Sequence, residues 1–185
     1  MDRANHYESA FEAYLQANKI CYVAVDEQRR SSLGGEPVKS LDFILYGENG
    51  LRFVVDIKGR KFPSGPPEKP RRVWECWSTV ADIDGLERWA QISGPSFQGL
   101  LVFVYQLDDS IEFDNRIPDL WNFRNHRYLA RAVLVNDYRA NMRVRSPKWG
   151  TVDLPGKVFR SLVRPLAEFL ELPEFLESPE PDEWN

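Results

Sequence analysis

The sequence predicts an α/β fold in which helices flank a central mixed β-sheet. Three observations lead to this expectation: a helical pattern near the N-terminus, two alternating apolar/polar segments between residues 40 and 58, and a nearly continuous apolar run at residues 99–107. Alternation is typical of strands with one buried face, and a continuous apolar run is typical of a strand buried on both faces. The order helix, strand, hairpin, helix, strand across residues 5–107 therefore favours an α/β sandwich.

The segment from residue 40 to residue 58 reads as a β-hairpin with its turn at Glu48-Asn49-Gly50. A two-residue turn would mix apolar and polar side chains on each face, whereas a three-residue loop that ends with a left-handed Gly50 pairs Tyr46 with Arg52. The longer loop makes one face apolar throughout, because a one-residue slip would lose that burial. On this face three side chains of the first strand oppose three of the second: Leu41, Phe43 and Leu45 against Ile57, Val55 and Phe53.

The same register gathers charged side chains on the polar face. Asp42 is expected directly opposite Asp56, with Cβ atoms roughly 4.5 to 5.5 Å apart, and Lys58 shares their face. Two carboxylates at this spacing can share a hard cation such as Mg²⁺, and an ammonium beside them can orient a water molecule. The pattern indicates hydrolysis of phosphodiester bonds. The alternative is a structural cluster of ion pairs.

With these residues placed, the sequence resembles the PD-(D/E)XK nuclease superfamily, which includes many restriction enzymes and the archaeal Holliday-junction resolvases. Asp42 matches the first acid, with Leu41 in place of the usual proline, and Asp56-Ile57-Lys58 matches the (D/E)xK element. The resemblance implies an αβββαβ restriction-endonuclease-like core, to which this chain adds a C-terminal hairpin and helix. It also implies a metal-dependent DNA endonuclease that uses Mg²⁺, or Mn²⁺ in vitro. A catalytically silent nucleic-acid-binding module on the same fold is the alternative.

The resemblance also suggests roles for individual residues. It implies a metal site formed by Asp42, Asp56, Glu8 and Ile57, with Lys58 positioning the attacking water. Glu8 lies on a helix expected over residues 5–18, one turn before Glu12. The spacing of Glu8 from the apolar residues Phe11 and Leu15 fits the superfamily pattern better than that of Glu12. The alternative for both glutamates is a solvated position in a helix start, where the dipole favours acids.

A second resemblance lies at the start of this helix. The segment from His6 to Glu12, HYESAFE, is similar to the signature of HYExAFE, a family of bacterial proteins. This match suggests a family but no activity. The expected activity therefore depends on the acids and the lysine.

Basic and hydroxyl side chains that are candidates for phosphate contacts fall in three segments. They are Arg29, Arg30 and Ser31 in a polar loop; Arg60, Lys61, Lys69, Arg71 and Arg72 in a Pro-rich stretch; and Arg143 and Arg145 in the second arm of a later hairpin. Ordinary solvated positions are the alternative for each set. Gln91 occupies a helix position where superfamily members often carry a polar residue near the site.

The remaining elements follow from periodicity and turn residues. We expect a buried-type strand at 20–25, a short strand at 73–77, a helix at 84–93, no regular element at 108–127, a hairpin with arms at 128–135 and 139–145 around Asn136-Asp137, and a helix at 155–170 with a kink at Pro165.

Composition and charge agree with a globular, cytoplasmic protein of one domain over residues 1–172. The chain has 185 residues, 43% of them hydrophobic, and no apolar run approaches the roughly 18 residues of a membrane span. Its two cysteines lack the spacing of a zinc site or a disulfide scaffold. The net charge of −4 reflects an acidic stretch near the C-terminus, and residues 173–185 are expected to form a flexible tail. DNA is the expected partner, RNA is a second candidate, and a homodimer is left open.

Overall fold

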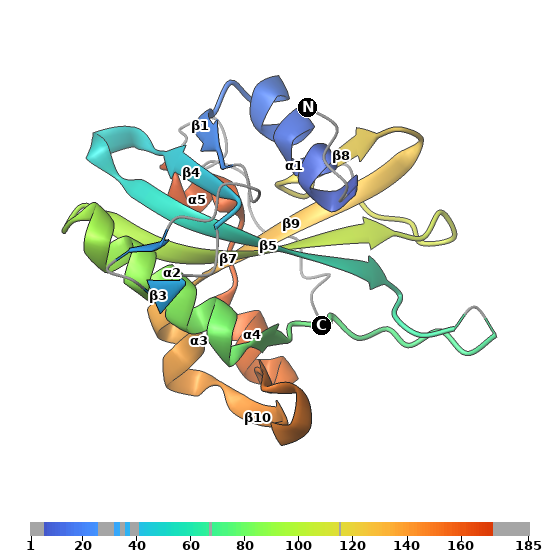
Figure 1. The fold of residues 1–185 in the computed structure, drawn as a ribbon. Helices are drawn as coiled ribbons and strands as arrows, with labels where there is room; N and C mark the ends of the chain where they lie inside the picture. Colours follow the sequence, from blue (N-terminus) through green and yellow to red (C-terminus); the bar gives the residue numbers. More distant parts are fainter. Residues whose placement is uncertain are drawn as a thin grey trace.

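A six-stranded mixed sheet forms the centre of the protein (Figure 1). The computed structural model describes residues 6–25, 32–33, 36–37, 41–66, 68–114 and 116–171. The sheet has the strand order β1-β4-β5-β7-β9-β8, with β5 and β7 parallel and the other neighbours antiparallel. Its strands are β1 (Cys21–Ala24), β4 (Phe43–Tyr46), β5 (Arg52–Phe62), β7 (Phe97–Leu107), β8 (Leu120–Phe123) and β9 (His126–Leu134). The predicted mixed α/β fold is confirmed.

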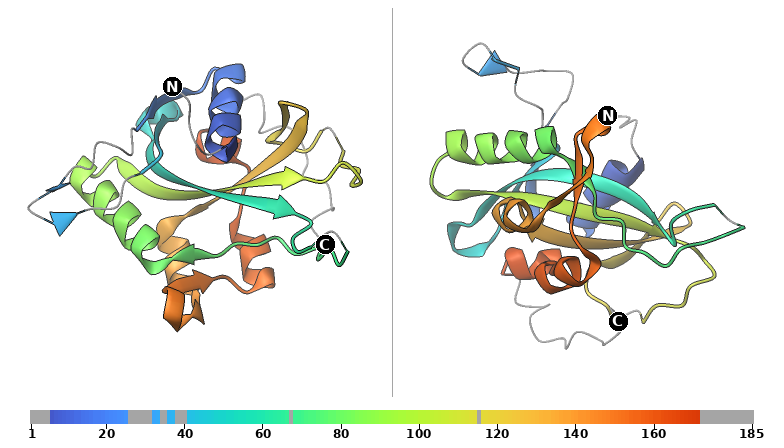
Figure 2. Two further views of the ribbon diagram at one scale, coloured as in Figure 1. Left: turned by 45° about the vertical axis from the view of Figure 1, so that its right-hand side comes forward. Right: turned by 90° about the horizontal axis from the view of Figure 1, so that it is seen from below.

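Helices cover both faces of this sheet (Figure 2). Apolar side chains of α1 (His6–Ala17) and α5 (Leu166–Phe169) share one core with residues of the sheet that include Phe43 and Val55. On the other face, α2 (Val80–Ser93), α3 (Val135–Asn141) and α4 (Gly156–Leu162) share a second core with residues that include Val54 and Leu101. Neighbouring side chains of one strand therefore enter opposite cores, as the alternation along a strand requires. No helix in the described part of the chain has the length and apolar character needed to cross a membrane.

The predicted register of the β4–β5 hairpin is confirmed. Tyr46 pairs with Arg52 and Phe43 pairs with Val55 across a short 3-10 turn (η1, Glu48–Gly50), in which Gly50 has a φ of 77°. A positive φ is readily adopted by glycine, which explains the residue at this position.

The regular pairing ends one residue before the predicted acid pair. The ladder stops at Phe43, and the Asp42 N–H donates to the carbonyl of Val55. Leu41 lies in the α2-side core rather than on the α1 side with Phe43. The expected placement of Leu41 opposite Ile57 is therefore wrong, because the strand alternation breaks at Asp42.

The C-terminal hairpin is present but uses other strands than expected. Strand β9 pairs with β7 and β8, and helix α3 follows it directly, so Asn136-Asp137 lies in a helix and not in a hairpin turn. The hairpin consists of β10 (Arg143–Ser146) and β11 (Thr151–Asp153), joined by the 3-10 turn η2 (Pro147–Trp149). Gly99 allows α3 to approach the sheet, because a Cβ there would lie 2.5 Å from Cγ1 of Val135.

Several other element predictions need correction. Strand β1 lies at the sheet edge with alternately exposed residues and is not a buried strand. Residues 73–77 form no strand; β6 (Ser78–Thr79) follows them and pairs with β11. Strand β8 lies within the segment 108–127, for which no regular element was expected. The helix expected over 155–170 is divided into α4 and α5, because Arg164 forms a β-bridge with Ala132.

Two short strands complete the described elements. They are β2 (Ser32–Leu33) and β3 (Glu36–Pro37), which pair with each other. The expected acidic tail at 173–185 and the candidate contacts Arg29, Arg30 and Ser31 lie outside the described residues.

Candidate active site

Strand β5 carries the central residues of the candidate site. Val54 enters the α2-side core whereas Val55 and Ile57 enter the α1-side core. The intervening Asp56 and Lys58 therefore point toward helix α2. Asp56 is only 7% exposed, and the side chain of Lys58 is 13% exposed. Both charges are thus largely removed from solvent. Interactions between neighbouring charges are stronger in such a buried environment than in water.

Asp42 lies at the edge of this strand. The backbone N–H of Ile57 donates a 2.6 Å hydrogen bond to Oδ2 of Asp42, which is 5% exposed. Burial and the nearby carboxylates of Asp56 and Glu8 raise the pKa of Asp42 to about 8, against the lowering effects of the Ile57 N–H and of Lys58. Asp56 and, to a lesser extent, Glu8 are therefore close enough to Asp42 to act on its charge, although the three acids come from different parts of the chain.

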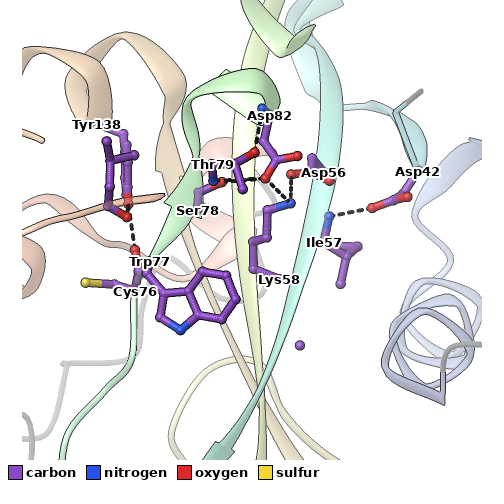
Figure 3. Close-up of polar contacts among 12 residues, drawn as sticks. Asp42, Asp56, Ile57, Lys58, Cys76, Trp77, Ser78, Thr79, Asp82 and Tyr138 are labelled. Atoms are coloured by element: carbon purple, nitrogen blue, oxygen red, sulfur yellow. Dashed lines mark hydrogen bonds and ion pairs between the residues drawn. The ribbon is translucent and has the colours of Figure 1, made fainter. Parts of the chain in front are cut away.

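Lys58 lies between two carboxylates (Figure 3). Its Nζ forms an ion pair with Oδ2 of Asp56 and lies 3.0 Å from Oδ2 of Asp82 on helix α2. Asp82 was not among the site residues predicted from the sequence. The spacing of Thr79 and Asp82 in the sequence matches a capping box, and the two residues form one at the start of α2.

A divalent cation fits the chemistry of these donors, although the described residues do not form a complete cage. Carboxylate oxygens are the ligands that Mg²⁺ prefers, and the crowded acids favour a positive charge between them. Oδ2 of Asp56 is buried and makes no hydrogen bond within the described part of the chain; its contact with Lys58 is an ion pair without hydrogen-bond geometry. No three His, Cys, Asp or Glu residues among those described come together as a metal-binding group. Asp42 and Asp56 therefore fit a cation as a pair that needs further ligands.

Three of the candidate phosphate-binding residues, Arg71, Arg143 and Arg145, line one pocket together with Trp77, whereas Arg60 is engaged in contacts within the protein. Arg60 stacks over the ring of Trp77, with Cζ 3.9 Å from the ring centroid, and donates hydrogen bonds to the carbonyls of Trp77 and Gly59. Burial is the main cause that lowers its pKa. Arg60 thus fastens the segment before α2 to strand β5. This contact leaves it less available to a ligand than its position in the sequence suggested.

The other basic candidates are exposed. Arg145 lies over the same Trp77 ring at 5.2 Å, and Arg143 forms an ion pair with Asp153 at 2.8 Å. Gln91 is exposed near the C-terminal end of α2, the end opposite Asp82, and lines a separate pocket there. The exposed basic residues described in the Pro-rich stretch are Lys61, Lys69, Arg71 and Arg72.

Comparison with known proteins supports the fold. No family model and no curated protein matches this sequence. Among solved structures, the chain is similar to Hjc from Archaeoglobus fulgidus, a Holliday junction resolvase from an archaeal hyperthermophile, with a TM-score of 0.50 and 11% sequence identity over 88% of this chain and 96% of Hjc. The chain has a restriction-endonuclease-like fold. In this fold α1, β1, β4, β5, α2 and β7 form the αβββαβ core, and at 11% identity the likeness extends to the fold alone.

Proposed function

We propose that this protein is a divalent-metal-dependent nuclease that hydrolyses phosphodiester bonds in DNA. The observation that carries the proposal is the crowding of two buried carboxyls, Asp42 and Asp56, with Lys58 against Asp56. Asp42 has a raised pKa because it is buried beside Asp56 and Glu8, and the ammonium of Lys58 lies against Asp56. A buried carboxyl with a raised pKa beside further acids is typical of catalytic centres, and Asp42, Asp56 and Lys58 belong to the central hairpin segment of a nuclease-type fold.

Each residue has a distinct role in this proposal. Asp42 and Asp56 would hold Mg²⁺ or Mn²⁺ as a pair, with Glu8 and the main-chain carbonyl of Ile57 as further ligands. The N–H of Ile57 orients the Asp42 carboxylate. The bound cation would stabilise negative charge on the phosphate and lower the pKa of a coordinated water. Lys58 would hold the attacking water and stabilise charge that develops on the phosphate.

The proposed partner is DNA with a branched structure. The structural neighbour Hjc is a Holliday junction resolvase, which makes a four-way junction the first substrate to test. Lys61, Lys69, Arg71 and Arg72 follow Lys58 along the chain and would contact phosphates. We treat residues 1–172 as the functional domain of a cytoplasmic protein that acts as a dimer, and the HYESAFE segment as a mark of the HYExAFE family.

A cleavage assay with a panel of substrates tests the proposal. Labelled four-way junction, duplex, single-stranded DNA and RNA would each be incubated with Mg²⁺, Mn²⁺, Ca²⁺ or a chelator. We expect cleavage of DNA with Mg²⁺ or Mn²⁺ and none with the chelator. Cleavage that persists in the chelator would contradict the proposed site.

A binding module is the second candidate, and one observation favours it. Lys58 forms ion pairs with Asp56 and Asp82. The ammonium therefore already neutralises the charge of Asp56, which a bound cation would otherwise neutralise. A protein of this type would bind DNA but cleave no substrate with either metal. The same panel therefore separates the two functions.

A further inference from the structure

Helix α2 supplies Lys58 with a second carboxylate, in addition to that of Asp56 on strand β5. Oδ2 of Asp82 lies 3.0 Å from Nζ of Lys58, and the Asp82 side chain is 3% exposed. We propose that Asp82 is a positioning residue that holds the Lys58 ammonium in place beside Asp56. The inference deepens the proposed function, on which the catalytic role of Lys58 rests.

The Asp82 carboxylate is held in place independently of Lys58. Its Oδ2 accepts hydrogen bonds from the Ser78 hydroxyl at 3.1 Å and from the Thr79 N–H at 3.0 Å. In return, the Asp82 N–H donates to the Thr79 hydroxyl at 3.1 Å, which completes the capping box of α2. Because the Thr79 N–H that holds the carboxylate belongs to the main chain, the carboxylate is fixed by the start of the helix itself.

The start of α2 is in turn fastened to the C-terminal hairpin. Ser78 and Thr79 form strand β6, which pairs with β11 through Val152 and Thr151. The N–H of Val80 also donates to the carbonyl of Gly150 at 2.9 Å. The position of Asp82 relative to the sheet is therefore set by main-chain hydrogen bonds, which are stiffer than contacts between exposed side chains.

Asp56 cannot serve as the same kind of anchor. Its Oδ2 forms an ion pair with Lys58 but makes no hydrogen bond within the described residues. In the proposed function the negative charge of Asp56 is shared with a cation, which weakens its attraction for an ammonium. Asp82 leaves Lys58 with one anionic partner in that state, so the ammonium remains beside the reacting phosphate.

Replacement of Asp82 by asparagine distinguishes the effect of its negative charge on Lys58 from its role in the capping box of α2. The substitution Asp82→Asn keeps an oxygen that accepts from Ser78 and Thr79 but removes the negative charge facing Lys58. Asp84→Asn is the matched control, because it removes an acid from the same helix at a side chain that is 60% exposed. Both changes alter the net charge equally.

The first readout is the NMR signal of the Lys58 ammonium in metal-free, ¹⁵N-labelled protein, assigned by its absence in Lys58→Arg. An ammonium held by hydrogen bonds exchanges its protons slowly enough to be seen. We expect the signal in the wild type, in Asp84→Asn and in Asp56→Asn, and its loss in Asp82→Asn. A signal that persists in Asp82→Asn, or one lost in Asp56→Asn alone, would overturn the inference.

The second readout is the rate of the chemical step. With saturating DNA, Asp82→Asn should lower the single-turnover cleavage rate roughly 10²-fold, with DNA affinity unchanged, because only the positioned charge is lost. A fall in affinity with an unchanged rate would contradict the assigned role. If Asp82→Asn fails to fold, Ser78→Ala removes one of the donors that fix Asp82 and should weaken the NMR signal; an unchanged signal there would count against the inference.

The two readouts distinguish this inference from the proposed function. Absence of cleavage by the wild type would end the nuclease proposal but would leave the NMR result unchanged. Loss of the ammonium signal in Asp82→Asn would still show that Asp82 positions Lys58.

Discussion

The N–H of Ile57 donates a 2.6 Å hydrogen bond to the carboxylate of Asp42, at the point where strand β4 has not yet begun. This bond places a buried acid of the incoming chain beside an acid of strand β5. Burial, together with the nearby Asp56 carboxylate, raises the pKa of Asp42 to about 8, and we expect this to make the site sensitive to pH and to cations.

The first prediction concerns pH and the free energy of unfolding. The folded protein keeps a proton on Asp42 up to about pH 8, whereas the unfolded chain loses it near the ordinary value of about 3.9. The unfolded state binds fewer protons across this window, so stability should fall as pH rises, by an amount on the order of a few kcal/mol. Asp42→Asn should remove this slope, because the amide resembles the protonated acid.

Urea unfolding at several pH values between about 5 and 9 checks this expectation. The variant should be at least as stable as the wild type at the alkaline end of the window. Asp84→Asn is the control for loss of an acid, since Asp84 is exposed and should leave the slope intact. An unchanged slope in Asp42→Asn would mean that another group is responsible.

The second prediction concerns stabilisation by metal. A cation bound to Asp42 and Asp56 must displace the proton on Asp42, so Mg²⁺ should raise the melting temperature more at about pH 8 than at about pH 6. Thermal unfolding with Mg²⁺ and with a chelator measures the difference. Asp56→Asn should abolish the Mg²⁺-dependent shift; an equal shift in this variant would place the metal elsewhere.

The third prediction concerns the close approach of helix α1 to strand β5. A Cβ at Gly59 would lie closer than 3.0 Å to the ring of Tyr7, the neighbour of Glu8. Gly59→Ala should therefore displace the start of α1 and lower the free energy of unfolding by about 1–3 kcal/mol. Gly156→Ala is the control, because its Cβ would meet only the end of the Arg160 side chain, at 3.8 Å.

Denaturant unfolding of the two alanine variants compares them directly. Since Glu8 would move with Tyr7, Gly59→Ala should also weaken the Mg²⁺-dependent stabilisation. Equal stability of both variants would show that the ring of Tyr7 moves aside without cost.

The fourth prediction concerns nucleic-acid affinity. Replacing Arg71 and Arg72 by Ala should weaken DNA binding and lower its dependence on salt, because each lost phosphate contact releases fewer counterions. Arg71 is exposed, and its ion pair with Glu75 is long, at 3.5 Å, so it competes weakly with a phosphate. Arg116→Ala, a change at a side chain that is 87% exposed in another loop, is the control. If the salt dependence of binding equals that of the wild type, neither arginine contacts a phosphate.

Much of the sheet could be predicted because burial imposes a period of two on the hairpin. The pairing of Phe43 with Val55 follows from this pattern, since any slip would expose the apolar face. The acids could be identified for the same reason, as polar residues placed between apolar ones. The break at Asp42 could not, because it depends on a hydrogen bond to the main chain of Ile57.

The parts that were missed depend on contacts between distant segments. Asn136-Asp137 is a common turn signal, but an acid is also favourable in the first turn of a helix, and packing of Val135 over Gly99 decides for α3. Likewise, Arg164 leaves the helical pattern because it pairs with Ala132 of β9. Asp82 reads locally as a capping residue, and only the fold brings it to Lys58.

The most direct test of the central claim is the rate of DNA cleavage with Mg²⁺ by the wild type, Asp56→Asn and Lys58→Ala, measured on the substrate that the wild type cleaves best. We expect Asp56→Asn to abolish cleavage and the Mg²⁺-dependent stabilisation while the fold is preserved, because the two side chains have nearly the same shape. Lys58→Ala should keep the metal-dependent stabilisation, since both carboxylates remain, but slow hydrolysis by several orders of magnitude. Cleavage that survives both substitutions would contradict the account, because the site would then lie elsewhere in the protein.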